Sequence, residues 1–398
     1  MANLFSVPQF IFSGENALQT SMDQVADFGK KALIVTDKLM SDLGNANKLT
    51  EELDKHGVSY CLYPEINAEP THSMIDRGVE LYLNEGCDFL IALGGGSPLD
   101  AMKAIGAVYA NGGNIRDYMG KKIEHHLPHM CAIPTTAGTG SEATKISIIT
   151  NTDTDVKMLL SDPKLMVDMA ILDSDFTITV PPEVTAATGV DALTHAIEAY
   201  TSIKAFAMSD LYALSAVDKI FENLYEVYIN GTNTAARREM SIAAFEAGVA
   251  FSNASVTIIH GMSRPIGALF HIPHGMSNAM LLKVCLNYLK PGAVFKLYQL
   301  SKAIGVYRVG MTREEGADAF VTATIALLRA LKIKTPMDYG VTRDAFFSNI
   351  PKMAEDAMAS GSPLNTRRTP SKEDLQELYA KFWYDSEIVN ASRNTNEA

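Results

Sequence analysis

Two kinds of hydrophobic pattern divide the chain near residue 180. Up to about residue 178, short and nearly continuous apolar runs alternate with segments whose apolar residues recur at helical spacing. This alternation is typical of βαβ units whose parallel sheet is covered by helices on both faces. The predicted strands are residues 32–36, 59–63, 89–93, 130–133 and 170–172, and the predicted helices between them include 73–84 and 99–109.

Beyond Pro181 and Pro182 the helical period persists, and few β-rich runs interrupt it. A period of about 3.6 residues, sustained over segments of this length, indicates amphipathic helices. The segments that carry it are 184–200, 208–228, 234–251 and 313–331. We therefore predict an α/β domain with a parallel sheet over residues 1–178 and an all-helical domain over residues 179–398.

Composition and charge narrow the class of protein. The 398 residues are enough for two domains of ordinary size, each with its own core. Lys and Arg number 34 against 46 Asp and Glu, and the net charge of -12 repels nucleic acid and anionic membranes. We expect neither as a partner.

The cysteines and the first residues bear on the compartment. The four cysteines are scattered without a C-x-x-C pair, which indicates core residues of a reducing compartment rather than disulfides or a zinc site. Residues 1–12 lack the basic and apolar regions of a signal peptide, and no uncharged apolar stretch of about 18 residues occurs. We therefore expect a soluble, cytoplasmic protein.

The first candidate site is a glycine triplet, 94–96, at the end of a predicted strand. Ser97 and Pro98 follow it and suit the N-cap and the first position of a helix. Glycines let backbone N–H groups approach a diphosphate closely, and the positive end of a helix favours its charge. A plain tight turn is the commoner origin of three glycines, because the motif is not G-x-G-x-x-G.

A second loop of small residues, 134–142, also follows a predicted strand and offers hydroxyl and N–H groups to a phosphate or a ribose. Two such loops at the carboxyl ends of parallel strands meet at the crevice where α/β sheets bind ligands. Gly94 and Thr139 are candidate cofactor contacts on these grounds. Asp37 is placed to bond a ribose 2′-hydroxyl and to repel a 2′-phosphate, which favours NAD over NADP. A turn-forming aspartate is its alternative role.

The second half contains a candidate metal site. Asp191 and His195 are four residues apart and so share one face of a predicted helix. Further on, three of the nine histidines follow one another closely, namely His260, His271 and His274. One such histidine alone is usually a hydrogen-bonded core or capping residue, but the aspartate–histidine pair together with the cluster favours a metal ligand set.

The ligand types restrict the metal and its chemistry. Imidazole and carboxylate suit Fe(II) or Zn(II) better than Mg²⁺ or Ca²⁺, and they leave iron and zinc open. Glu198, on the same face, is expected to be solvated or to support a ligand rather than to bind the metal. A metal with an open position lowers the pKa of an alcohol and polarises an aldehyde carbonyl, while a nicotinamide exchanges the hydride.

Together these motifs are similar to those of the iron-containing (group III) alcohol dehydrogenases, which are related in fold to glycerol dehydrogenase and 3-dehydroquinate synthase. The resemblance runs over nearly the whole chain and keeps the motifs in order. It implies an N-terminal Rossmann-like domain, a C-terminal helical domain in a dehydroquinate synthase-like architecture, and an active site between them. The matching segments are 12–14, 35–38, 94–100, 134–142, 188–198 and 260–275.

The resemblance also implies site residues and assembly. Relatives form dimers or larger assemblies built from dimers, so a homo-oligomer such as a homodimer is expected. The implied ligands of Fe(II), or alternatively Zn(II), are Asp191, His195, His260 and His274. The positions implied to contact NAD are Asp37, Gly95, Gly96, Ser97, Asp100, Thr135, Thr136 and Lys157.

One position departs from the family. Many members carry a histidine four residues after the third metal ligand, where it is proposed to relay a proton, and this chain has Arg264. Arginine stays protonated and only donates, so it cannot shuttle a proton. Either His271 or a water chain takes over the relay, or Arg264 binds a carboxylate or sulfonate on a short aldehyde. A third role for Arg264 is an ion pair with a nearby glutamate or with the NAD phosphates.

The expected reaction is hydride transfer between NAD(H) and a small primary alcohol, diol or short aldehyde, with the substrate itself left open. A reductase of small anionic aldehydes that uses Arg264 is the first alternative. A metal- and NAD-dependent cyclase of the dehydroquinate synthase type is the second. The cyclase is disfavoured because residues 260–274 lack the dense Lys and Arg set that a phosphorylated sugar acid requires.

Overall fold

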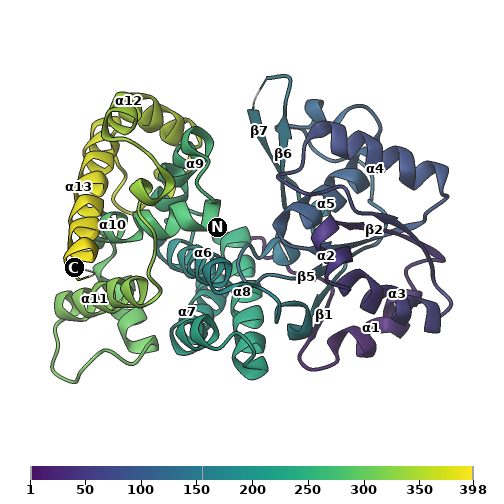
Figure 1. The fold of residues 1–398 in the computed structure, drawn as a ribbon, viewed down its shortest axis with the longest axis horizontal. Coiled ribbons are helices and arrows are strands. Elements are labelled where there is room, and N and C mark those ends of the chain that lie inside the picture. The colour runs from purple at the N-terminus through teal and green to yellow at the C-terminus, as the bar shows by residue number, and fades with distance from the viewer. Residues whose placement is uncertain (1, 155, 397–398) are drawn as a thin grey trace. The chain divides into compact units, whose positions relative to one another are not determined.

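The computed structural model describes residues 2–154 and 156–396, and Figure 1 labels its elements along the chain. The chain divides into two compact units. The first unit comprises Leu4–Val180 and Gly231–Ser252, and the second comprises residues 2–3, Pro181–Asn230 and residues 253–396.

The first unit is built on a six-stranded parallel sheet with strand order β1-β8-β5-β4-β2-β3. The five predicted strands are confirmed to within one residue at each end, whereas β1 was not predicted. Its apolar run is only three residues long, and its four residues alternate between half-buried and exposed at the edge of the sheet. The strands are β1 (Phe10–Ser13), β2 (Lys31–Thr36), β3 (Ser59–Tyr63), β4 (Phe89–Gly94), β5 (Met130–Pro134) and β8 (Met169–Leu172).

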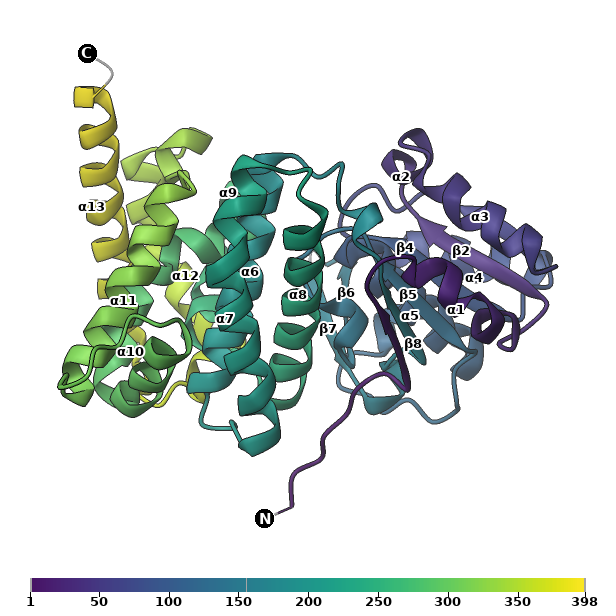
Figure 2. The ribbon, with the colours of Figure 1, turned by 90° about the horizontal axis from the view of Figure 1, so that it is seen from below.

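Helices cover both faces of this sheet (Figures 1 and 2). Successive strand residues point into opposite cores, since Ile34 joins the core that includes residues of α1 and α3, and Val35 joins the core of α4 and α5. This two-sided burial explains why the predicted strands are apolar throughout. The helices are α1 (Ala17–Ala26), α2 (Lys38–Asp42), α3 (Asn45–Lys55), α4 (His72–Asn84) and α5 (Gly96–Asn111).

A separate antiparallel hairpin, β6 (Ile146–Asn151) and β7 (Val156–Ser161), also belongs to the first unit. It was not predicted, because its buried residues alternate with exposed ones over short strands. Ile149 and Met158 nevertheless join the same core as α4 and α5.

The second unit is built from helices, so the predicted fold class is confirmed. Helix α6 packs against α7, and α10 packs against α6, α9 and α11. The helices are α6 (Pro182–Thr201), α7 (Ala207–Ile229), α9 (Ile258–Phe270), α10 (His274–Ala303), α11 (Arg313–Ala330), α12 (Arg343–Ala359) and α13 (Lys372–Asn396).

The predicted helix 234–251 forms as α8 (Thr234–Ala254), and all but its last two residues belong to the first unit. Within the part of the chain that the structure describes, no single helix has the length and apolar composition needed to cross a membrane. The bent pair of α8 and α9, taken together, passes that test of length and composition.

Gly140 is the point at which the second small-residue loop meets α8. It adopts a left-handed conformation with φ of +62°, and a Cβ there would lie 2.6 Å from the Cα of Gly248. Gly44 has a similar left-handed φ of +76° but nothing within 4 Å of its Cβ position. Only Gly140 therefore combines backbone strain with a steric clash against another backbone.

We expect Gly140→Ala to lower the free energy of unfolding by about 2–5 kcal/mol, because strain and clash add. The matched control Gly44→Ala should cost only about 1 kcal/mol, since it carries the strain alone. Urea denaturation of the purified variants measures both values. Equal losses would mean that the approach of Gly140 to Gly248 is not what requires glycine.

Candidate functional site

Three of the predicted metal ligands lie together in the second unit. Asp191 and His195 are one turn apart on α6, and His260 lies in the first turn of α9. All three are buried, and their ligand atoms lie within 4.8 Å of one another. The rings of His195 and His260 stack with centroids 4.5 Å apart. The fold thus brings together side chains that are nearly seventy positions apart in the sequence.

His274, the first residue of α10, lies beside these three residues. Its Nε2 is 3.9 Å from Oδ1 of Asp191, and the Nε2 of His260 is 3.7 Å from the same oxygen. The side chain of His274 is 45% exposed, whereas that of His260 is 3% exposed. His274 is therefore the exposed member of the cluster.

Asn278, one turn after His274 on α10, was not predicted. Its Nδ2 lies 2.7 Å from Oδ1 of Asp191, 3.1 Å from Nε2 of His260 and 3.3 Å from Nε2 of His274. Three of the four predicted ligand atoms therefore converge on one small electropositive group. The Oδ1 of Asn278 is buried and has no hydrogen-bond partner among the described residues.

The electrostatics of the cluster fit a divalent cation. Burial raises the pKa of Asp191 and lowers the pKa of His260 well below its usual range. A bound cation stabilises the ionised carboxylate of Asp191 and so opposes the rise in its pKa. The cation also requires a neutral imidazole, and the lowered pKa of His260 favours that form. One carboxylate and three imidazoles suit a borderline metal such as Fe(II) or Zn(II).

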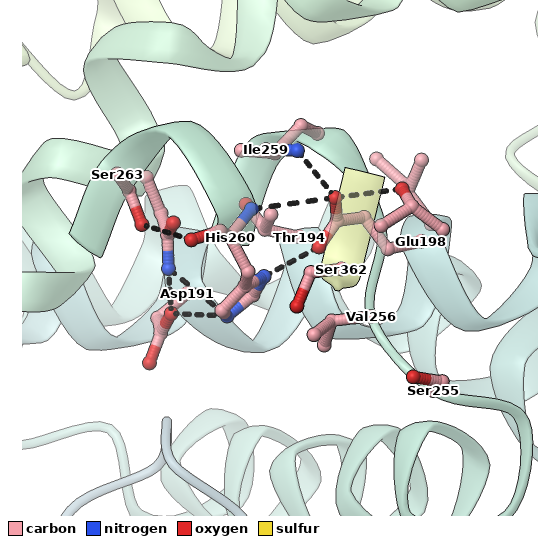
Figure 3. A network of polar contacts seen from close by, with 12 residues as sticks. Asp191, Thr194, Glu198, Ser255, Val256, Ile259, His260, Ser263 and Ser362 are labelled. Atoms are coloured by element: carbon pink, nitrogen blue, oxygen red, sulfur yellow. Dashed lines mark hydrogen bonds and ion pairs between the residues drawn. The ribbon is translucent and has the colours of Figure 1, made fainter. Parts of the chain in front are cut away.

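Glu198 lies on the Nδ1 side of the His260 ring and is fully buried (Figure 3). It accepts hydrogen bonds from Nδ1 of His260, from Oγ1 of Thr257 at 2.7 Å and from the backbone N–H of Ile259 at 2.6 Å. With Nδ1 engaged in this way, the lone pair on Nε2 faces Nδ2 of Asn278 at 3.1 Å, the nitrogen that Asp191 also contacts. Of the two roles expected for Glu198, burial rules out the solvated one, and the contacts fit support of a ligand.

The two predicted catalytic residues lie in different surroundings. Arg264 is partly buried one turn after His260 on α9, and its Nη1 donates to Oγ of Ser362 at 3.1 Å. His271 is exposed at the end of α9 with a left-handed φ of +54°. Among the residues that the structure describes, no hydrogen bond, ion pair or ring contact joins His271 to the cluster.

In the first unit, the two predicted cofactor loops lie against each other after the adjacent strands β4 and β5. A Cβ on Gly95 would lie 3.6 Å from Oγ1 of Thr136, and one on Gly96 would lie 3.0 Å from Cγ2 of Thr139. Thr135 is buried, and its backbone N–H donates to the carbonyl of Gly94 at 2.9 Å. The loops therefore form one surface of backbone N–H and hydroxyl groups.

Helix α5 begins earlier than predicted. Gly95 is its N-cap and Gly96 its first residue, so the prediction that Ser97 caps the helix and Pro98 opens it is wrong by two positions. The extended backbone of Gly95 passes from strand to helix without a connecting turn. As a result, the N–H groups of Gly96 and Ser97 belong to the first turn, which has no intrahelical acceptors for them.

The surroundings of Asp37 are compatible with both roles considered from the sequence, namely a turn-forming residue and a contact of the ribose. One oxygen, Oδ1, caps α2 by accepting the N–H of Met40 at 2.9 Å. The other, Oδ2, is 3.4 Å from the Cβ position of Gly94 and so lies at the glycine loop. Burial raises the pKa of Asp37, and the backbone hydrogen bonds at the cap oppose that shift.

Asp100 and Lys157 make contacts within the protein. Asp100 accepts from Oγ of Ser141 at 2.6 Å and from the N–H of Ile148 at 3.0 Å, so both carboxylate oxygens hold other segments in place. Lys157, on β7, pairs with Glu69 at 2.6 Å. The contacts of Asp100 anchor the second loop, and those of Lys157 do not involve either loop.

Lys103, three residues after Asp100 on α5, was also not predicted. It is fully buried and donates to the backbone carbonyls of Ser141 at 2.6 Å, Thr144 at 2.9 Å and Ile146 at 2.9 Å. Burial lowers the pKa of Lys103 to about 8, and the charge of Asp100 opposes that shift. Three carbonyl acceptors match the three N–H donors of an ammonium group. Lys103 therefore holds the end of the second loop, at Ser141, and the residues that follow it against α5.

Comparison with known families covers both units. Residues 8–174 match the model of the iron-containing alcohol dehydrogenases, and residues 185–383 match the model of the C-terminal part of the same family. The chain belongs to the iron-containing alcohol dehydrogenase family. The resemblance stated from the motifs is thereby confirmed.

Individual members of the family align with nearly the whole chain. Lactaldehyde reductase of Escherichia coli strain K12 is 35% identical over 389 residues, which are 96% of this chain and 100% of that protein. The structure of a 1,3-propanediol oxidoreductase superposes with a TM-score of 0.93 at 31% identity, covering 96% of this chain and 100% of that chain. Sulfoacetaldehyde reductase from Bifidobacterium kashiwanohense, solved with NAD+, has a TM-score of 0.87 at 26% identity, covering 96% and 99%.

Family membership decides between the enzyme classes that the motifs left open. This iron-containing alcohol dehydrogenase is an oxidoreductase of alcohols and aldehydes, and not a cyclase of the dehydroquinate synthase type.

Proposed function

We propose that the protein transfers a hydride between NAD(H) and a small primary alcohol, diol or short aldehyde, with one Fe(II) held by Asp191, His195, His260 and His274. The observation that carries the proposal is the convergence of Asp191, His260 and His274 on the single amide nitrogen of Asn278. Acceptor atoms that meet at one point are the arrangement that a single cation requires.

Each residue of the cluster has a role in this proposal. A bound Fe(II) would act as a Lewis acid that polarises the substrate oxygen. Asp191 supplies the one negative charge of the ligand set. Glu198 holds His260 in the tautomer that is protonated at Nδ1, so that Nε2 is available to the metal. His274, the exposed member, borders the side on which the substrate enters. Zn(II) fits the same donor types and is the alternative metal.

The cofactor role is assigned to the loops of the first unit. In the proposal, the diphosphate binds the N–H groups of Gly96 and Ser97 at the positive end of α5. The free oxygen of Asp37 then selects a ribose 2′-hydroxyl over a 2′-phosphate, which favours NAD over NADP. The similar sulfoacetaldehyde reductase was solved with NAD+, which supports this choice of cofactor.

The proposed substrates are small. The similar proteins are named for lactaldehyde, 1,3-propanediol and sulfoacetaldehyde, which are all short molecules with an aldehyde or a primary alcohol at a terminal carbon. Hydride transfer requires the reacting carbon to lie about 3–3.5 Å from the nicotinamide.

An anaerobic assay tests the proposal. Purified protein loaded with Fe(II) is mixed with NADH or NADPH and, separately, with lactaldehyde, propanal and 3-hydroxypropanal, and the absorbance at 340 nm is followed. We expect steady consumption of NADH with at least one of these aldehydes and slower consumption of NADPH. The proposal fails if no short aldehyde consumes either cofactor, or if a sugar-acid phosphate releases phosphate under the same conditions.

We also propose that the chain assembles as a homo-oligomer, a dimer or a multiple of dimers, in the cytoplasm. Support comes from the family relationship and from the scattered, reduced cysteines. Light scattering on the eluted protein measures the mass, and a mass equal to one chain at micromolar concentration would overturn the assembly.

A further inference from the structure

Arg264 places a permanent positive charge beside the metal cluster. It lies one turn after His260 on the same face of α9 and is partly buried. Its hydrogen bond is to the neutral hydroxyl of Ser362, at 3.1 Å. No carboxylate of the described residues lies within 4.0 Å of its guanidinium group. A glutamate ion pair, one of the roles considered from the sequence, is therefore not formed.

The position of Arg264 is fixed by the packing around it. Ser362 begins the short helix η6 (Ser362–Asn365), and the next residue, Pro363, lies so close to α9 that a Cβ on Gly261 would be 2.6 Å from its Cγ. The hydroxyl of Ser362 therefore holds one nitrogen of the guanidinium in place. A guanidinium carries five N–H donors, so most of its hydrogen-bonding capacity is left for another partner.

The charge of Arg264 acts on the metal ligands. Burial is the main cause of the lowered pKa of His260, and the electrostatic influence of His195 and of Arg264 adds to it. In the other direction, burial lowers the pKa of Arg264 and the charge of Glu198 raises it. Arg264 is therefore within electrostatic reach of the atoms that would hold the metal.

We propose that Arg264 binds an anionic group on the substrate, a carboxylate or a sulfonate, while the aldehyde end of the same molecule faces the metal cluster. A planar guanidinium with free donors pairs with such groups through two parallel hydrogen bonds. A partly buried cation without a charged partner is costly, and an anionic substrate supplies the missing charge. One helical turn separates Arg264 from His260, which suits a substrate of about two to four carbon atoms.

This inference rests on the proposed function, but it makes a narrower claim. It assigns the selection of charge to the residue at which the chain departs from many of its relatives. Neutral aldehydes would still reach the metal cluster, because Arg264 is not one of the proposed metal ligands.

The test uses the Fe(II)-loaded enzyme and pairs of aldehydes matched in length. Butanal is compared with 4-oxobutanoate, and propanal with sulfoacetaldehyde, in the wild type, Arg264→Met and Arg264→His. We expect Arg264→Met to lower kcat/KM for the anionic aldehydes by about 10- to 100-fold and to change the neutral ones by less than about twofold. Arg264→His should lose the same preference while keeping neutral turnover. The exposed control Arg343→Met should change neither class.

A binding measurement separates this inference from the proposed function. Propanoate and ethanesulfonate cannot be reduced, so calorimetry of their binding to the NADH-bound enzyme reports on the anion site without turnover. We expect binding to the wild type and a loss of about 10- to 100-fold in affinity in Arg264→Met. If every aldehyde fails in the wild type but this binding difference holds, the proposed function is wrong and the anion site stands.

Three results would overturn the inference. Equal losses for neutral and anionic aldehydes would mean that Arg264 balances the charge of Glu198. A loss confined to NADH affinity would mean that it binds the cofactor phosphates. Unchanged selectivity and unchanged calorimetry in Arg264→Met would mean that it binds no anion.

Discussion

Asp191→Asn is expected to remove bound iron and to reduce aldehyde reduction by at least about 1,000-fold, which corresponds to about 4 kcal/mol of activation free energy. Asp191 is the one carboxylate of the predicted ligand set and is buried among three histidines. Asparagine has nearly the same shape but no charge, so the cation would be left with neutral ligands only. The expected loss is the largest that a single substitution causes in this account.

The same substitution should leave the metal-free protein at least as stable as the wild type. A buried carboxylate is costly when no cation is bound, and burial raises the pKa of Asp191 for this reason. Iron content after anaerobic loading, NADH consumption and thermal unfolding of the chelated protein measure the three effects. The control is Asp42→Asn, which removes an exposed carboxylate paired with Lys38. Full iron content and turnover in Asp191→Asn would contradict the ligand assignment.

Substitution of Glu198 is expected to weaken iron binding by about 10- to 100-fold without touching a ligand atom. Glu198 accepts hydrogen bonds from Nδ1 of His260, from Oγ1 of Thr257 and from the backbone N–H of Ile259. In Glu198→Gln the single amide oxygen can accept only some of these hydrogen bonds. The ring of His260 is then less firmly oriented. In Glu198→Ala all three donors lose their acceptor inside the protein, and we expect a further loss of about 3–5 kcal/mol in the free energy of unfolding.

Competition with a chelator measures the iron affinity of both variants, and urea denaturation measures their stability. Glu183→Gln is the matched control because Glu183 lies on the same helix, α6, but is exposed and paired with Lys334. A positioning role predicts weaker iron binding in Glu198→Gln even where its stability is close to that of the wild type. Unchanged iron affinity in both Glu198 variants would refute that role.

The parts of the fold that were predicted are those in which local pattern and tertiary burial agree. The strands β2 and β4 are apolar throughout because helices cover both of their faces, and that burial is visible in the sequence. Strand β1 and the hairpin β6–β7 are short and leave many residues exposed or only half-buried, so their apolar patterns are weaker than those of the central strands.

Helices α9 and α10 were missed for a different reason. Both contain a proline, Pro265 in α9 and Pro291 in α10, and α10 also has a non-helical residue at Ala293. Proline disfavours a helix interior because it lacks the N–H and clashes with the preceding turn. Packing of α10 against α6, α9 and α11 outweighs this local preference, and packing between distant segments leaves no mark in the local sequence.

The residues of the candidate site also divide into those that a local sequence pattern predicts and those that it does not. Asp191 and His195 were found because their spacing places them on one helical face. Asn278 and Lys103 were not singled out, although each lies one turn from a candidate residue, because asparagine and lysine are common on exposed helix faces. Their contacts depend on how α10 meets α6 and α9, and on how α5 meets the second loop. These contacts are set by tertiary structure alone.

The central claim is that one Fe(II) per chain, held by the cluster around Asp191, is needed for hydride transfer. The most direct test is an anaerobic titration of metal-free protein with Fe(II), in which bound iron and NADH-dependent aldehyde reduction are measured in the same samples. We predict that turnover rises in proportion to bound iron and stops rising at one iron per chain. Full turnover in the metal-free protein, or turnover that does not follow bound iron, would contradict the account.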